Sequence, residues 1–363
     1  MDLADSANLA LANLTSVPVL AFVLGVVSTA VFRSPLRLPE GAYRFLSFYL
    51  LLAIGVKGGV ALSQARIEDV IGPAIAALAL GLVIPVAAFG ALRLVTRLSV
   101  VDRGAMAAHY GSTSLVTFTA ATALLAATSI PVEGFAPTLL SIMEVPGIVV
   151  ALALVGLRRR SKAQVAAPAK ERALVSVGSG GSTEADAPGH TSVAEGETAP
   201  ASWNATLREV LTAPSVLLLV GGLVIGLITG PTGFTKVDPL FNGLFQGLLA
   251  LFLLHLGAVA GATLSSVRRA GFGLVAFAVV FPVIAGSVGV LVGTEIGLSI
   301  GGATILGVLC ASASYIAAPA AVGLALPQAN RGLCLSASLG MTFPFNLIIG
   351  IPVLVALATV LAR

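Results

Sequence analysis

The sequence HYGSTSLVT, at residues 109–117, places four serine or threonine hydroxyls and a glycine in the middle of an otherwise apolar stretch. A second run of the same character, CASASYIAAP, occupies residues 310–319 and ends on a proline. Lipid offers no hydrogen bonds to an unpaired backbone, so a membrane helix breaks only where it lines a cavity or is buried in protein. The two runs therefore predict two interrupted membrane helices that face each other across a site.

Apolar sequence surrounds both runs along most of the chain. Of the 363 residues, 57% are hydrophobic and 10% are charged, and the mean hydropathy is +1.03. A soluble domain carries about 25% charged residues, so a water-soluble enzyme is excluded and an all-α integral membrane protein is expected. The net charge of +4 does not indicate nucleic-acid binding, because the basic residues lie in short loops. Cys310 and Cys334 lie in apolar sequence and indicate neither a disulfide nor a metal site.

Ten apolar segments approach the roughly 20 residues that a membrane-crossing helix needs. They are 16–32, 45–62, 71–92, 104–127, 136–157, 212–229, 243–264, 271–293, 301–325 and 333–360. The stretch between the fifth and sixth, 158–206, is rich in Gly, Ser, Pro and acidic residues and predicts a disordered linker. The chain thus divides into a five-helix repeat at 1–157, the linker, and a second five-helix repeat at 207–363.

Basic residues are distributed unevenly between the two sides of this arrangement. Most of the 20 lysine and arginine residues follow the first, third, fifth, seventh and ninth segments. Cytoplasmic loops carry the excess of positive charge in membrane proteins. The distribution therefore predicts that both termini lie outside and that the linker is cytoplasmic.

The two halves resemble each other weakly but in the same order. GVKGGVAL from Gly55 corresponds to GAVAGATL from Gly257, and MEVPG around Pro146 corresponds to MTFPF around Pro344. Each half holds an odd number of segments, so the second copy must be inverted in the membrane. Inverted repeats with interrupted helices are typical of secondary transporters, whose binding sites lie near the membrane midplane.

Two helices that restart at the polar runs would direct free N–H groups and positive dipole ends at a bound anion. The residues expected to surround this anion are Gly111, Ser112, Thr113, Ser114 and Thr117 from the first run, and Ser312, Ser314 and Tyr315 from the second. The alternative is that these small residues only allow helices to pack closely. Their matched positions in the two halves favour a site.

Two charged residues lie inside the predicted spans. Lys57 is the only basic residue deep within a span, and an intramembrane charge marks a functional site by default. Glu144 precedes Val145–Pro146, where we expect the fifth helix to break. Its carboxylate can pair with Lys57, bind a cation, carry a proton or play a structural role. His109 and His255 are expected to be packing residues rather than ligands.

Four stretches follow one another along the chain: IGVKGGVAL, GSTSLVT, SIPVEGFAPTLLSIMEVPG and CASASYIAAPAAVGLALPQAN. In this order they resemble the cyanobacterial sodium-dependent bicarbonate transporters, over about 300 residues that exclude the linker. The resemblance implies ten membrane helices in a 5+5 inverted repeat, a homotrimer, and sodium-coupled uptake of bicarbonate across the plasma membrane. It also implies regulation by a soluble PII-like nucleotide-binding protein on the cytoplasmic side.

The sequence departs from the pattern of that family at three positions. Tyr315 stands where the family has an aspartate, Lys57 where it has a small hydroxyl residue, and Leu115 where it has a glycine. Glu144 retains the carboxylate of a family aspartate. Because one carboxylate is lost and an ammonium is gained, we expect anion transport with weak or no sodium dependence, in which Lys57 offsets the charge of the anion.

The function predicted from the sequence is therefore secondary transport of a small anion, with bicarbonate first and Na⁺ as a candidate coupling ion. One alternative is a sodium-independent or proton-coupled carrier of another small anion or carboxylate. Another is a non-transporting membrane sensor or scaffold that binds a soluble partner through its linker. No arranged nucleophile, phosphate-binding loop or metal-ligand spacing indicates an enzyme, and no cofactor or nucleic-acid partner is expected.

Overall fold

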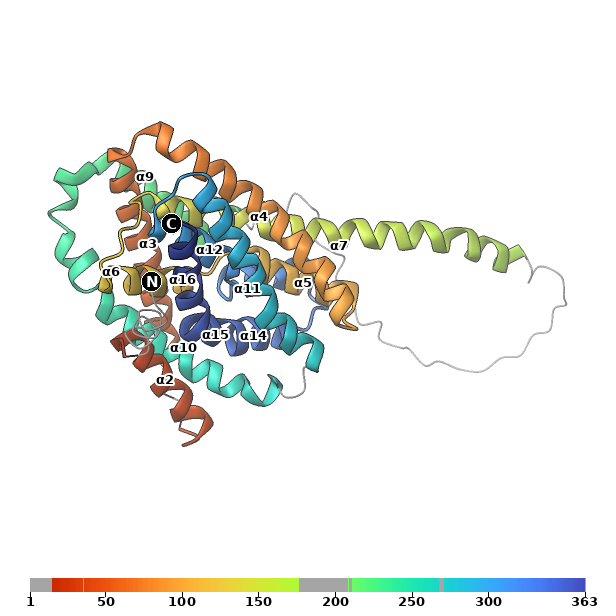
Figure 1. Cartoon of the computed structure of the whole chain (residues 1–363). Helices are drawn as coiled ribbons and strands as arrows, with labels where there is room; N and C mark the ends of the chain where they lie inside the picture. The colour runs from red at the N-terminus through yellow and green to blue at the C-terminus, as the bar shows by residue number, and fades with distance from the viewer. Residues whose placement is uncertain (1–14, 35, 176–207, 209–210, 268–270, 363) are drawn as a thin grey trace.

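The computed structural model describes residues 15–34, 36–175, 208, 211–267 and 271–362, which form helices and connecting segments without strands (Figure 1). Within these residues, seven helical segments are long and apolar enough to cross a membrane. They are α3 (Glu40–Gln64), α4 (Ile67–Val95), the first part of α7 (Ala136–Val175), α9 (Pro214–Phe234), α10 (Phe245–Val267), α11 (Phe272–Glu295) and the last segment, Arg331–Leu361. The expectation of an all-helical membrane protein is thereby confirmed.

Shorter helices cover the other three predicted spans. They are α2 (Val17–Ala30), the pair α5 (Val100–Gly111) and α6 (Leu115–Ala127), and the pair α12 (Ile300–Ala311) and α13 (Ala317–Ala325). Each pair lies within one predicted span, so both expected interruptions are present. The full count of ten membrane crossings stays a prediction.

The last membrane segment contains two wide, π-type turns. It runs through α14 (Arg331–Ala337), η2 (Ser338–Thr342), α15 (Phe343–Phe345), η3 (Asn346–Gly350) and α16 (Ile351–Leu361). Pro344 and Pro352 have no N–H to donate, so each removes one bond from the regular α-helical ladder. The wide turns lie at these two points, as is common where a helical ladder is interrupted.

Helix α7 differs from its prediction in two ways. It continues through Pro146, where we expected a break, because the bundle around this turn keeps the helix intact although the carbonyl of Ile142 loses its usual donor. It also continues to Val175 and projects from the bundle (Figure 1). Residues 158–175, predicted as the start of the linker, are thus helical, and they hold five alanines, four arginines and two lysines, which favour helix. The domain boundaries stay a prediction. Residues 176–207 lie outside the described part.

One group of helices packs through glycines. Helix α3 lies along α9, and α10 lies along α2. A side chain at Gly55 or Gly59 of α3 would overlap backbone atoms of α9, and one at Gly257 of α10 would overlap the carbonyl of Phe22 in α2. These absent side chains let the helix backbones touch, as in other small-residue membrane interfaces.

The second group contains the broken helices. Helices α4 and α7 pack against α5, and α11 and α16 pack against α12. The first N–H groups of both α5 and α12 are capped by serine, since the hydroxyl of Ser99 accepts from Asp102 N and that of Ser299 accepts from Gly302 N. The start of each of these helices also binds a loop of the opposite half. Before α12, the amide of Ser299 donates to the carboxylate of Glu133, and in α5 the carboxylate of Asp102 accepts from the amide of Asn330. The two broken helices are thus fixed at the same point of each half.

Candidate functional site

The first interruption is short and extended. Helix α5 ends at Gly111, and Ser112 and Ser114 have the backbone angles of a strand (φ −102°, ψ 144° and φ −104°, ψ 111°). The hydroxyl of Ser114 then caps α6 by accepting a hydrogen bond from the amide of Thr117 at 3.3 Å. A serine side chain in this position replaces the backbone acceptor that the first turn of a helix lacks.

The second interruption follows the same plan. Helix α12 ends at Ala311, and α13 begins at Ala317 with Pro319 in its first turn, where a proline costs no hydrogen bond. The hydroxyl of Ser314 accepts from the amide of Ala318 at 3.3 Å. The carbonyl of Ala311, left free by the break, accepts a hydrogen bond from the side-chain Nδ2 of Asn346 at 2.8 Å.

The two interruptions bind each other. The amide of Ser114 donates to the hydroxyl of Ser312 at 2.9 Å, and the amide of Ser314 donates to the carbonyls of His109 at 2.7 Å and Ser112 at 3.2 Å. His109 completes the contact because its Nδ1 lies 2.6 Å from the carbonyl of Ser314, which can only accept. The two breaks therefore cross directly, and two of the amides expected to face an anion already have partners.

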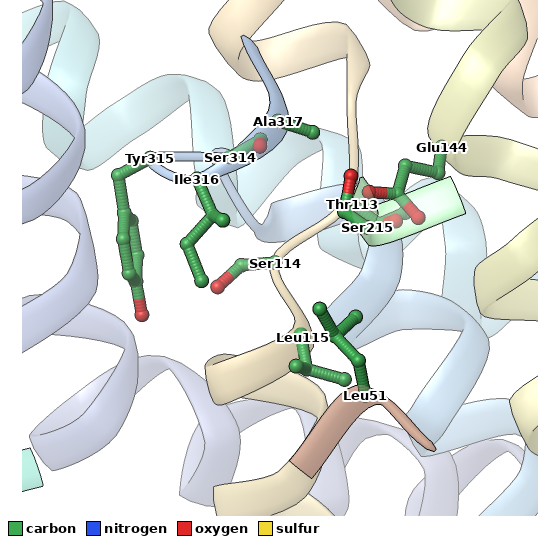
Figure 2. Close-up of a pocket in the computed structure, with 10 residues that line it drawn as sticks. All are labelled: Leu51, Thr113, Ser114, Leu115, Glu144, Ser215, Ser314, Tyr315, Ile316 and Ala317. Atoms are coloured by element: carbon green, nitrogen blue, oxygen red, sulfur yellow. The ribbon is translucent and has the colours of Figure 1, made fainter. Parts of the chain in front are cut away.

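A buried cavity lies beside this crossing. Its lining comes from both breaks, from α7, and from α3 and α9 of the glycine-packed group (Figure 2). The residues are Leu51, Thr113, Ser114, Leu115, Glu144, Ser215, Ser314, Tyr315, Ile316 and Ala317. The cavity is narrow and has room for about one water molecule. It is the place where hydroxyl groups of both halves and one carboxylate meet.

The buried polar side chains of the cavity differ in their hydrogen bonds. Glu144, at 7% exposure, points toward Thr113 and toward Ser215 at the start of α9 (Figure 2). The Thr113 hydroxyl donates to the carbonyl of Leu140 at 3.3 Å. The Tyr315 hydroxyl is also buried and has no hydrogen bond of normal geometry, as is true of the Ser112 hydroxyl. Unpaired buried hydroxyls are costly, so a polar occupant of this region would be stabilised.

The structure thus brings together five of the ten residues predicted for the site, namely Thr113, Ser114, Glu144, Ser314 and Tyr315. The other members of the two runs have supporting positions. The hydroxyl of Ser312 joins the breaks, and the backbone of Gly111 touches that of Gly147 in α7, where no side chain would fit. The carbonyl of Ser112 accepts from the amide of Ser314, and the amide of Thr117 donates to the hydroxyl of Ser114, which caps α6.

Lys57 is placed elsewhere. Its Nζ lies 4.6 Å from the ring centre of Phe245 at the start of α10, and Lys57 is not among the residues that line the cavity. Within the described residues the ion pairs are Arg44 with Glu40 and Arg66 with Glu68, so the pairing of Lys57 with Glu144, one of the alternatives considered for Glu144, is not formed. A cation over an aromatic face is a favourable contact in its own right.

Sequence reasoning missed several residues of the site. Ser215 follows a proline at the start of α9, where a serine reads as an ordinary helix-start residue. Leu51 and Ile316 carry no chemical signal. Asn346 was the one with a detectable signal, since a lone amide inside an apolar span must find a partner.

A second cavity, of about 300 Å³, lies between the starts of α2 and α10 and the C-terminal part of α6. Its lining is mostly alanine, leucine and proline, and its polar members are Ser16 and Gln246. It therefore offers little to an anion.

Comparison with known families adds a finding to this geometry. Residues 18–359 match the model of the Na⁺-dependent bicarbonate transporter superfamily. The chain belongs to this superfamily. The match spans both groups of helices and both interruptions, and it confirms the resemblance found in the sequence. No curated protein matches the chain.

Proposed function

We propose that this member of the bicarbonate transporter superfamily is a secondary transporter of a small anion, with bicarbonate as the first candidate, and that the anion binds where the two broken helices cross. The observation that carries the proposal is the cavity at this crossing, where hydroxyls from both breaks meet. A broken helix is stable in a membrane only where protein or an aqueous cavity satisfies its backbone. At this point of the fold the backbone has protein partners and lies beside a cavity.

A 5+5 inverted repeat accounts for the contacts between the helices. Exchanging α2 with α9 and α3 with α10 converts the packing of α3 on α9 into the packing of α10 on α2, and both are observed. Serine caps begin both α5 and α12, and the cap of Ser114 on α6 matches that of Ser314 on α13. Such repeats place the substrate at their interface, which supports a site at the crossing.

The chemistry of the cavity suits an anion with several acceptor oxygens. Thr113, Ser114, Ser314 and Tyr315 line it, and the hydroxyls of Ser114, Ser314 and Tyr315 each have a proton to donate, whereas the Thr113 hydroxyl donates to Leu140. The first amides of α6 and α13 also point toward this end of each helix, and those before the capped amides of Thr117 and Ala318 have no acceptor within their own helix. Because the amides of Ser114 and Ser314 bind the opposite break, the anion would be held by side-chain hydroxyls and by these helix-start amides.

Further parts of the proposal rest on the charge distribution and on the family. The excess of basic residues on one side supports a plasma-membrane orientation with external termini and a cytoplasmic linker. A homotrimer and a PII-like cytoplasmic regulator are proposed by analogy with the resemblance noted above. Tyr315 supplies no carboxylate, so we propose weak sodium dependence.

The full chain in liposomes tests the proposal. Exchange of labelled bicarbonate should exceed that of protein-free liposomes, which measure the share carried by diffusing CO₂, and should change little when sodium is replaced by potassium. A strict sodium requirement would make the protein a sodium symporter. Absence of exchange with bicarbonate and with small carboxylates would favour a sensor or scaffold.

A further inference from the structure

We propose that Glu144 is the proton-carrying group of this transporter, so that the coupling ion is a proton. The proposal rests on the anion-transport function proposed above. Within the described residues, Glu144 is the only buried carboxylate, and its side chain lines the cavity beside both helix breaks (Figure 2). A carboxylate kept in such a place at a cost in solvation is a functional group by default.

The surroundings of Glu144 supply hydroxyl groups and no positive charge. Ser215 faces it from α9, and a serine hydroxyl can donate to a carboxylate or accept from a carboxylic acid. Tyr315 is the only other titratable residue of the lining. Of the neighbouring helices, α4 buries only apolar side chains and α5 contributes His109, whose ring is bound to Ser314. Both protonation states of Glu144 therefore have a partner.

The charge of Glu144 matters to an anion in the same cavity. Two like charges repel each other strongly where protein shields them from water. Lys57 lies over Phe245 and so is not placed to offset either charge. A proton bound at the carboxylate removes the repulsion, which makes the binding of proton and anion mutually favourable.

The oxygen atoms near Glu144 favour a proton over a metal cation. Hard cations take several oxygen ligands at short range. The Thr113 hydroxyl donates to the carbonyl of Leu140, and the hydroxyls of Ser114 and Ser314 each accept from one helix amide, so each serine oxygen has one lone pair left. The cavity has room for about one water molecule to complete a shell. A proton needs no coordination shell.

In the transport step, a proton from the outer solution binds Glu144 and converts its carboxylate to a carboxylic acid. The anion then binds beside the neutral side chain. After the site opens to the inside, both leave and the carboxylate is restored. Affinity for the anion should therefore be high at low pH and fall as rising pH removes the proton from Glu144.

Infrared difference spectroscopy on the full chain in lipid, without sodium, tests the titration itself. The carbonyl band of a protonated carboxylic acid should fade as pH rises, be absent in Glu144→Gln, and persist in Glu144→Asp and in the exposed control Glu68→Gln. A Glu144→Gln spectrum identical to that of the unmodified protein would overturn the proposal. So would loss of the band on adding sodium at constant pH, which would identify a sodium site.

Anion exchange in liposomes is the second test of the proposal. In the unmodified protein, acidifying the medium should lower the half-saturating anion concentration at least about fivefold, the lower end of typical coupling between two sites. In Glu144→Gln, which imitates the protonated state, the half-saturating anion concentration should no longer change with pH, whatever the rate of exchange. Retained pH dependence in Glu144→Gln would refute the coupling role. Because the infrared titration needs no substrate, it stands even if the proposed transport function fails.

Discussion

Ser114 and Ser314 each perform two tasks with different atoms. Their amides donate across the crossing to the opposite break, and their hydroxyls cap the helix that follows. Both side chains also line the cavity. A substitution that keeps the backbone but changes the side chain therefore separates the substrate site from the structural contact between the breaks.

We expect Ser114→Leu and Ser314→Leu to reduce anion exchange by about a hundredfold, the loss of rate that a misplacement of about 1 Å can cause in an enzyme. The reason is that the leucine fills a cavity with room for about one water molecule. Exchange in liposomes checks this. Ser63→Leu, at an exposed position near the end of α3, serves as the control and should transport normally. Normal exchange by both cavity variants would show that the breaks serve packing alone.

Lys57→Met is expected to leave exchange nearly unchanged. Its ammonium is half-buried over Phe245 and outside the cavity, so the variant loses a cation–π contact, worth up to about 2 kcal/mol of stability when desolvated, and an attraction to Asp238. Exchange rates and thermal unfolding of the variant measure the two effects. Loss of exchange with normal stability would restore the role for Lys57 that the sequence alone suggested.

At the scale of elements, the sequence predicted the two interruptions, their matched positions and the buried carboxylate. Polar runs inside apolar segments are visible in composition, and their meaning follows from the cost of unpaired backbone in lipid. The position of Lys57 was not predictable, because it depends on the rotation of α3 about its axis. The pairing of Ser114 N with Ser312 was hidden for a similar reason, since it depends on how closely two distant helices cross.

The glycine contacts between α3 and α9 give a prediction about stability. An added methyl at Gly59 would overlap the carbonyl of Leu223, whereas one at Gly90 of α4 meets open space. We expect Gly59→Ala to lower the free energy of unfolding by about 1–3 kcal/mol through overpacking. The matched control Gly90→Ala should be neutral or stabilising by up to about 1 kcal/mol. Thermal unfolding in lipid compares the two, and equal stability would contradict the tight packing of α3 on α9.

At the scale of the whole molecule, the two helix groups meet at the cavity. Leu51 and Ser215 come from the glycine-packed helices, and the hydroxyls and Glu144 come from the group that contains the breaks. The site therefore lies between two units that are each packed internally. The direction in which it opens is set by the orientation of the chain in the membrane.

That orientation is tested by single cysteines in a variant that lacks Cys310 and Cys334. An impermeant thiol reagent applied to intact cells should label Lys236→Cys, in the loop before α10, and should not label Arg97→Cys, in the loop before α5. The expectation follows from the excess of basic residues on the side of Arg97. The reverse labelling pattern would invert the assignment.

The central claim is that an anion binds at the crossing of the two broken helices. A high-resolution cryo-electron-microscopy map of the full chain in lipid with saturating bicarbonate tests it most directly, against a map recorded without bicarbonate. The account predicts new density among the hydroxyls of Ser114, Ser314 and Tyr315, within hydrogen-bonding distance of at least two of them. Bicarbonate density beside Lys57 and Phe245, with the crossing unchanged between the two maps, would contradict it.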